Sequence, residues 1–232
     1  DVSTPGLTST QLNQAKSNVA QYCADWVEYA NAPNDGSNPR GGIDWAVQRA
    51  QNGHQNPYNI KIWNMGNEPW ASGEFTTSAT GCTNYLTTIA PIIDSMLLAD
   101  PTIKISLSSV GPENSAWNTG ILNSSLVNAG KIYAICHHAF PDETNSSKRV
   151  SFFTSNYPNI ASNAAAKNVK MFIGDYAHDV PNGSSQAVQD LAVQWQGVTL
   201  CADYLLNVSQ IANIERVNYW QFGFTPALYH PI

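Results

Sequence analysis

Two short segments of the sequence place an acidic residue directly after an apolar run. Glu68 follows residues 60–64, and Asp175 follows residues 169–173. The carboxyl ends of parallel strands converge on one mouth, so these two acids can meet across a pocket although they are far apart in the chain. Two facing carboxylates are the minimum needed to cleave a glycosidic bond. One protonates the leaving oxygen, and the other stabilises or attacks the cationic carbon.

Spacing alone also allows a plainer interpretation of both acids. Gly66, Asn67 and Glu68 can form a simple turn, and Asp175 can cap the N-terminus of a following helix. The pattern therefore leaves a catalytic and a structural role open for each carboxylate.

The elements that must position these acids alternate along the chain. Short β-branched or aromatic runs bounded by turn residues predict buried strands, and segments with apolar residues on one helical stripe predict helices between them. The predicted strands are residues 60–64, 103–107, 132–136, 169–173 and 217–221, and the predicted helices are residues 12–29, 84–98 and 186–206. This order indicates repeated βα units and a parallel sheet, either doubly wound or closed into a barrel.

The stretch between residues 31 and 55 is different, because it is rich in Pro, Gly, Asn and Asp. We expect a long ordered loop there, with at most one helical turn around residues 43–50. No fixed-period repeat or linker divides the chain, so residues 1–232 are expected to form one domain.

Composition narrows the class of partner. Charged residues make up only 12% of the chain and the net charge is -6, without a basic cluster, which argues against nucleic acids and anionic membranes. No apolar run is long enough to cross a bilayer. The seven Trp and ten Tyr suit either sugar stacking or an ordinary core.

The cysteines and histidines show no spacing typical of a metal site, and no glycine pattern indicates a nucleotide, so neither a metal nor a cofactor is expected. The four cysteines are compatible with free thiols or with one disulfide bridge. Four Asn-X-Ser sequons, at Asn123, Asn145, Asn182 and Asn207, weakly favour a secreted protein. The chain begins with Asp1, so we expect a processed or excised piece.

Several segments in order resemble the α-L-arabinofuranosidase family of glycoside hydrolases, which belongs to a large clan of retaining barrel enzymes. The resemblance runs through residues 26–31, 49–54, 57–61 and 66–68, and continues through residues 100–104, 138–141 and 174–177. It covers nearly the whole chain. The linked Arg-Ala, Asn-Gly-His and Gly-Asn-Glu series is fairly specific, whereas Gly-Asn-Glu alone would indicate only the clan.

The resemblance implies an α/β fold of the (β/α)8 TIM-barrel type, with Glu68 as general acid/base after the fourth barrel strand. It places Asp175 at the nucleophile position of the seventh strand and Asn67 against the sugar 2-hydroxyl. Further residues expected to contact the substrate, an oligo- or polysaccharide, are Trp70, His137, His138, Tyr176, Trp220 and Gln221. For the histidines a buried structural role remains open, as does a core role for Trp220.

Three features depart from the family pattern. Asp175 stands where the family has Glu, which withdraws the carboxylate by roughly 1.5 Å. Ala139 and Phe140 lack the tyrosine hydroxyl that the family usually offers near the nucleophile. The chain is also expected to be a partial barrel, holding the equivalents of strands four to eight, with the other strands supplied by self-association or by a second chain.

The expected activity is exo-acting hydrolysis of terminal arabinofuranosides by double displacement. Two alternatives remain open at this point. One is an inactive homologue that binds carbohydrate, and the other is an endo-acting xylanase or glucanase of the same clan.

Overall fold

Five parallel strands form one sheet in the order β1-β2-β3-β4-β5. The computed structural model describes residues 8–70, 73–110, 116–139, 150–176 and 195–219. The strands are β1 (Ile62–Met65), β2 (Lys104–Ser108), β3 (Ile132–Ala139), β4 (Lys170–Tyr176) and β5 (Ile214–Tyr219). All five predicted strands are therefore present, and the parallel order confirms the prediction of repeated βα units.

The last strand begins three residues earlier than predicted, at Ile214 rather than Val217. Both side chains pack against the hydrophobic core, so burial extends the strand toward its N-terminus. Trp220 and Gln221, predicted at the end of this strand, lie outside the described residues.

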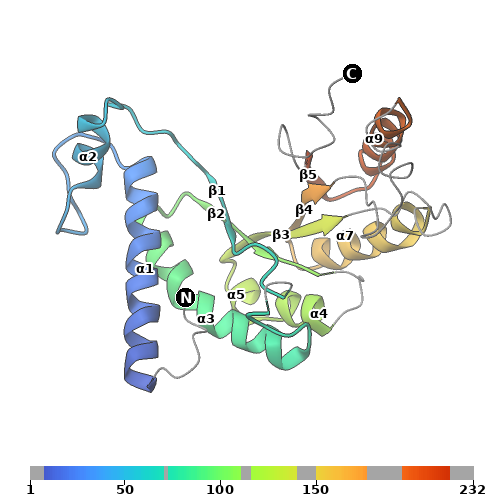
Figure 1. Ribbon diagram of the computed structural model, residues 1–232, viewed down its shortest axis with the longest axis horizontal. Helices are drawn as coiled ribbons and strands as arrows, with labels where there is room; N and C mark the ends of the chain where they lie inside the picture. The colour runs from blue at the N-terminus through green and yellow to red at the C-terminus, as the bar shows by residue number, and fades with distance from the viewer. Residues whose placement is uncertain (1–7, 71–72, 111–115, 140–149, 177–194, 220–232) are drawn as a thin grey trace.

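Helices precede and separate the strands. They are α1 (Ser9–Asn31), α2 (Trp45–Gln51), α3 (Ala79–Ala99), α4 (Ala116–Leu122), α5 (Ser125–Asn128), α7 (Tyr157–Ala165) and α9 (Trp195–Val208), and the π-helix η1 (Phe152–Asn156) leads into α7. Helices α3, α4, α5 and α7 lie along one side of the sheet, whereas α1 stands beside α3 at one end (Figure 1).

The start of α1 differs slightly from its prediction. The helix begins at Ser9, three residues before the predicted start, and Thr8 caps it in a reciprocal capping box with Gln11. Of the predicted helix at residues 186–206, the described part begins at Trp195.

The two faces of the sheet differ. Strand residues such as Ile105, Leu107, Ile135 and Ile173 are buried in the main core, which the helices complete. A small separate cluster consists of Ala134, Cys136 and Phe172. Successive residues of a strand point to opposite faces of the sheet, so these side chains lie on the face opposite the main core.

The loop before β1 is ordered around a buried arginine. Helix α2 lies where at most one helical turn was predicted and is longer than that, at seven residues, and its Arg49 is fully buried. The guanidinium donates hydrogen bonds to the backbone carbonyls of Tyr29, His54 and Gln55. These bonds tie the loop to the end of α1, so the chain enters β1 from a fixed position.

All four cysteines are free thiols, which settles the two alternatives left open by the sequence in favour of no bridge. Among the described residues, no helix combines the length and apolar character needed to cross a bilayer.

Candidate active site

Glu68 lies on a backbone turn that begins where β1 ends. Gly66 has a φ of 84° and Glu68 a φ of 42°. Both values fall in the left-handed region, which a residue with a Cβ adopts at a cost of about 1–3 kcal/mol. Residues held in this way are concentrated at functional sites. The turn leaves the Glu68 side chain 31% exposed at the carboxyl end of the sheet.

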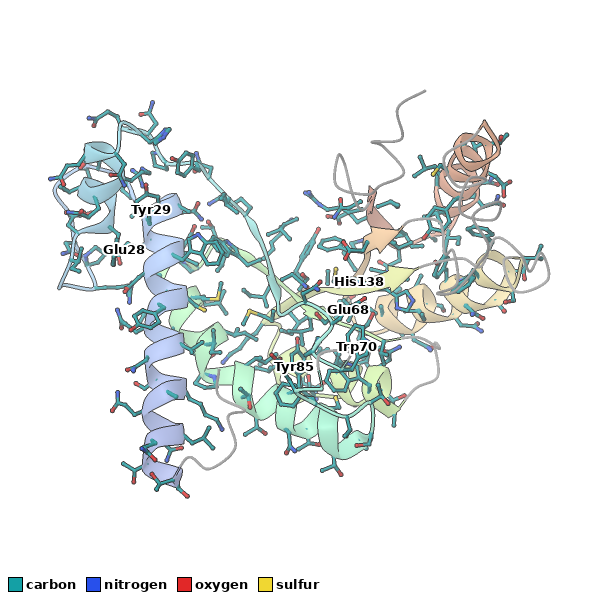
Figure 2. All side chains as sticks on the ribbon, viewed as in Figure 1. Glu28, Tyr29, Glu68, Trp70, Tyr85 and His138 are labelled. Carbon is teal, nitrogen blue, oxygen red and sulfur yellow. The ribbon has the colours of Figure 1, made fainter. Side chains whose placement is uncertain are left out.

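His138 connects Glu68 to Asp175. Its Nδ1 atom lies 2.9 Å from Oε1 of Glu68 and 3.3 Å from Oδ2 of Asp175. Since carboxylate oxygens accept hydrogen bonds, Nδ1 carries the hydrogen that faces them. Figure 2 shows Glu68, His138 and Trp70 close together near the strand ends, with Tyr85 beneath them.

The two contacts limit the separation of the acids. With 2.9 and 3.3 Å laid end to end, the two oxygens are at most 6.2 Å apart. Inverting glycosidases hold their carboxyl groups about 6.5–9.5 Å apart, and retaining ones about 5–5.5 Å apart. The two carboxylates predicted to face each other are therefore together, with their nearest oxygens within 6.2 Å of each other.

An irregularity between β3 and β4 brings His138 level with Asp175. The register shifts between His137 and His138, so that His138 pairs with Asp175 rather than Gly174. A Cβ on Gly174 would lie 2.3 Å from Sγ of Cys136 and 3.2 Å from Nε2 of His138. A side chain at this position would collide with the Cys136 thiol and press on the imidazole, which explains the glycine before Asp175.

Cys136 lies beside this pair but is held as a neutral thiol. Burial, reinforced by the charge of Asp175, raises its pKa to about 12. A thiol with so high a pKa is a poor nucleophile at neutral pH. Cys136 instead packs in the small buried cluster with Ala134 and Phe172.

Trp70 forms one wall. Its ring centroid lies 6.3 Å from that of His138 and 6.1 Å from that of Trp117, both in edge-to-face geometry. It also packs partly against the core. A ring fixed in this way supports His138 and borders the space in front of the acids.

His137 does not join the acids, although the family resemblance placed both histidines among the expected substrate contacts. It is 3% exposed, its Nδ1 lies 3.2 Å from the Ser109 hydroxyl, and its ring meets Tyr157 of α7. Burial lowers its pKa to about 4, with a smaller effect from His138. The structure gives His137 the buried, hydrogen-bonded role that the sequence left open, because alternate strand residues face opposite ways.

The structure describes only some of the other residues predicted to contact the substrate. Asn67 is exposed beside Glu68. Tyr176 lies in β4 and its backbone pairs with Ala139, whereas Trp220, Gln221 and Phe140 lie outside the described residues. Within the described part of the chain, no cluster of three or more His, Cys, Asp or Glu side chains is arranged to hold a metal ion.

Sequence reasoning missed the residues that support the site. Ser106 and Ser108 alternate with apolar residues in β2, and Asn64 occupies a similar position in β1. This period-two polar pattern within strands assigned to a core was a usable signal. Tyr85 gave no such signal, since an aromatic residue in a helix usually indicates core.

Residues 4–158 match the family model described as "Alpha-L-arabinofuranosidase 1 domain". The chain belongs to this family. A relative within the alpha-L-arabinofuranosidases, the exo-alpha-(1->6)-L-arabinofuranosidase of Bifidobacterium longum, is 29% identical over 143 residues, which cover 56% of this chain and 24% of that protein.

Solved structures of alpha-L-arabinofuranosidases show the same fold. The enzyme of Thermotoga maritima in an arabinose complex matches with a TM-score of 0.54 and 22% identity, over 86% of this chain and 41% of that one. The thermostable enzyme of Thermotoga petrophila matches with a TM-score of 0.61 and 20% identity, over 88% and 41%. The chain thus spans less than half the length of these relatives. Its five parallel strands, with the helices between them, are part of a (β/α)8 barrel, as predicted.

Proposed function

We propose that this chain carries the catalytic carboxyl groups of a retaining, exo-acting alpha-L-arabinofuranosidase. One observation carries the proposal: His138 Nδ1 contacts both Glu68 and Asp175, at 2.9 and 3.3 Å. Both acids remain partly accessible, with side chains 31% and 25% exposed, whereas the His138 side chain is only 5% exposed. A substrate can therefore reach the carboxyl groups without displacing the imidazole.

In the first step of the proposed reaction, Glu68 donates its proton to the glycosidic oxygen and the carboxylate of Asp175 attacks the anomeric carbon. The carbon–oxygen bond to the leaving alcohol breaks, and an ester joins the arabinosyl unit to Asp175. In the second step Glu68, now a carboxylate, takes a proton from water, which attacks the same carbon and releases Asp175. Two displacements retain the configuration of the sugar.

His138 supports both steps by keeping the acids close together without reacting itself. Its Nδ1 lies within 3.3 Å of an oxygen of each acid, so the imidazole fixes the position of one carboxyl group relative to the other. We propose that this contact takes the part of the hydroxyl missing at Ala139 and Phe140. Asn67, exposed next to Glu68, is proposed to hold the sugar 2-hydroxyl.

The proposed substrate is a terminal α-L-arabinofuranosyl unit of a plant-type oligo- or polysaccharide. Support comes from the family membership and from the name of the Bifidobacterium longum relative, an exo-acting enzyme. An inactive binding homologue would bind such oligosaccharides without releasing product, and an endo-acting xylanase or glucanase would cleave polymers internally.

The test compares an aryl α-L-arabinofuranoside, which has a good leaving group, with an arabino-oligosaccharide, which has a poor one. Glu68→Ala is expected to lose the oligosaccharide activity almost completely and the aryl activity less, because only the poor leaving group needs the proton. Asp175→Asn is expected to lose both. Proton NMR of the first product reports the configuration, and an inverted product or equal losses in Glu68→Ala would contradict the assignment.

We also propose that additional strands, from a second copy or a second chain, complete the barrel. Within the described residues β1 and β5 are the edge strands of the sheet, and unpaired strand edges favour association. Light scattering of the purified chain tests this, and a monomeric mass with full activity would contradict it.

Secretion is proposed from the sequons alone, and loss of mass on deglycosylation would support it.

A further inference from the structure

The turn that carries Glu68 is held by polar contacts to its backbone carbonyls. The carbonyl of Gly66 accepts hydrogen bonds from the Asn64 side-chain amide at 2.7 Å and from the Ser108 hydroxyl at 2.9 Å. The preceding carbonyl, of Met65, accepts one from the Tyr85 hydroxyl at 2.5 Å. Two consecutive carbonyls leading to Glu68 therefore have fixed directions.

Tyr85, from α3, continues the connection between β1 and β2 at the point where β1 leaves the sheet. The last register pair of these strands is Met65 with Leu107. Immediately beyond it, the backbone N–H of Ser108 donates to the Tyr85 hydroxyl at 3.3 Å, and that hydroxyl donates to Met65. Tyr85 is only 1% exposed. Since buried N–H and carbonyl groups need partners, the hydroxyl fixes where the turn begins.

Ser108 is the anchor of this arrangement. It is fully buried, and each of its polar groups has a partner: the N–H bonds Tyr85, the hydroxyl bonds Gly66, and the carbonyl accepts from the Trp117 indole at 2.9 Å. A residue bonded in three directions cannot shift without breaking one of these contacts. It therefore transmits the rigidity of the core to the turn.

We propose that Ser108 and Tyr85 are positioning residues for Glu68. The backbone of Glu68 adopts a left-handed conformation that it would not keep unaided. The hydrogen bonds to Gly66 and Met65 hold that conformation and aim the carboxyl group at His138 and at the substrate. The catalytic consequence rests on the function proposed above, whereas the effect on the position of Glu68 does not depend on it.

The test uses Ser108→Ala and Tyr85→Phe, each of which removes one hydroxyl. Ser109→Ala is the matched control, because Ser109 is also fully buried but its hydroxyl lies against His137. Thermal melts followed by circular dichroism verify that each variant folds. If Ser108→Ala does not fold, Tyr85→Phe carries the test with the same readouts.

Two readouts separate positioning from a general loss of stability. The first is kcat on the arabino-oligosaccharide, which is expected to fall about tenfold to a hundredfold with little change in KM, and to fall less on the aryl glycoside. The second needs no activity. It is the pH titration of the Glu68 carboxyl resonance by ¹³C NMR, assigned by its loss in Glu68→Gln. The titration midpoint is expected to move in both variants and to stay in Ser109→Ala.

The outcomes distinguish this inference from the proposed function. If the wild-type chain cleaves arabinofuranosides but both variants match Ser109→Ala in both readouts, the positioning role is refuted and the function stands. If the wild-type chain cleaves no arabinofuranoside, the function fails, and the titration of Glu68 alone decides the positioning role.

Discussion

Replacing His137 by asparagine is expected to flatten the pH dependence of the stability of this fold. The imidazole is buried, and its pKa falls from 6.5 to about 4 in the folded chain. Above pH 6.5 it is neutral in both states and has no effect on the pH dependence. Between pH 6.5 and pH 4 the unfolded chain binds a proton at this imidazole and the folded chain does not, so the free energy of unfolding decreases as the pH falls. Below pH 4 the folded chain binds the proton as well, and the decrease ends.

The size of the effect follows from this shift. Between pH 6.5 and 4 the free energy of unfolding changes by about 1.4 kcal/mol per pH unit, and by about 3 kcal/mol in total. From pH 7 to pH 5 the loss is about 2 kcal/mol, which corresponds to a decrease in Tm of about 4–8 °C for a domain of this size. His137→Asn loses this component, although the smaller side chain also leaves a cavity that lowers Tm at every pH.

The assay is a series of thermal melts at pH 7, 6 and 5 for the wild-type chain and His137→Asn. The wild type is expected to lose more Tm on acidification than His137→Asn. Equal slopes in the wild type and His137→Asn would refute the reasoning, because a buried neutral imidazole must produce the difference.

Three further predictions concern the site and its support. Gly174→Ala is expected to lower kcat severely, because the added methyl group crowds Sγ of Cys136. The double variant Gly174→Ala/Cys136→Ala is expected to recover part of the lost kcat. Equal kcat in the single and the double variant would contradict the crowding. Arg49→Met removes a fully buried guanidinium and leaves three backbone carbonyls without their donor. It is expected to cost about 3 kcal/mol or more in urea denaturation, whereas a loss below about 1 kcal/mol would be too small for that role. Asp175→Glu is expected to raise kcat on the aryl glycoside by extending the carboxyl group toward the anomeric carbon; unchanged or lower kcat would mean that the shorter acid is already well placed.

The parallel sheet was predictable because each strand is a short apolar run between turn residues, and such runs have few other stable placements. The approach of Glu68 to Asp175 was predictable for the same reason, since both follow strands whose carboxyl ends share one edge of the sheet. These inferences needed only local pattern and strand direction.

The difference between His137 and His138 was not predictable from sequence. Adjacent strand residues face opposite ways, so one of the two had to face the helices, but the pattern does not say which. The choice depends on the register shift opposite Gly174, which arises from packing between strands distant in the chain. Tyr85 was missed for a related reason, because its hydroxyl has a role only once β1 and β2 are side by side.

The left-handed backbone of Glu68 opposes heat resistance to the catalytic role proposed for this residue. A glycine at this position would relieve the strain at once, and an asparagine would tolerate it better than glutamate does. A library of variants of this chain selected only for survival at high temperature should therefore discard the glutamate early. The most thermostable descendants would be the ones least able to cut a sugar linkage, so directed evolution of this scaffold needs a screen for turnover from its first round.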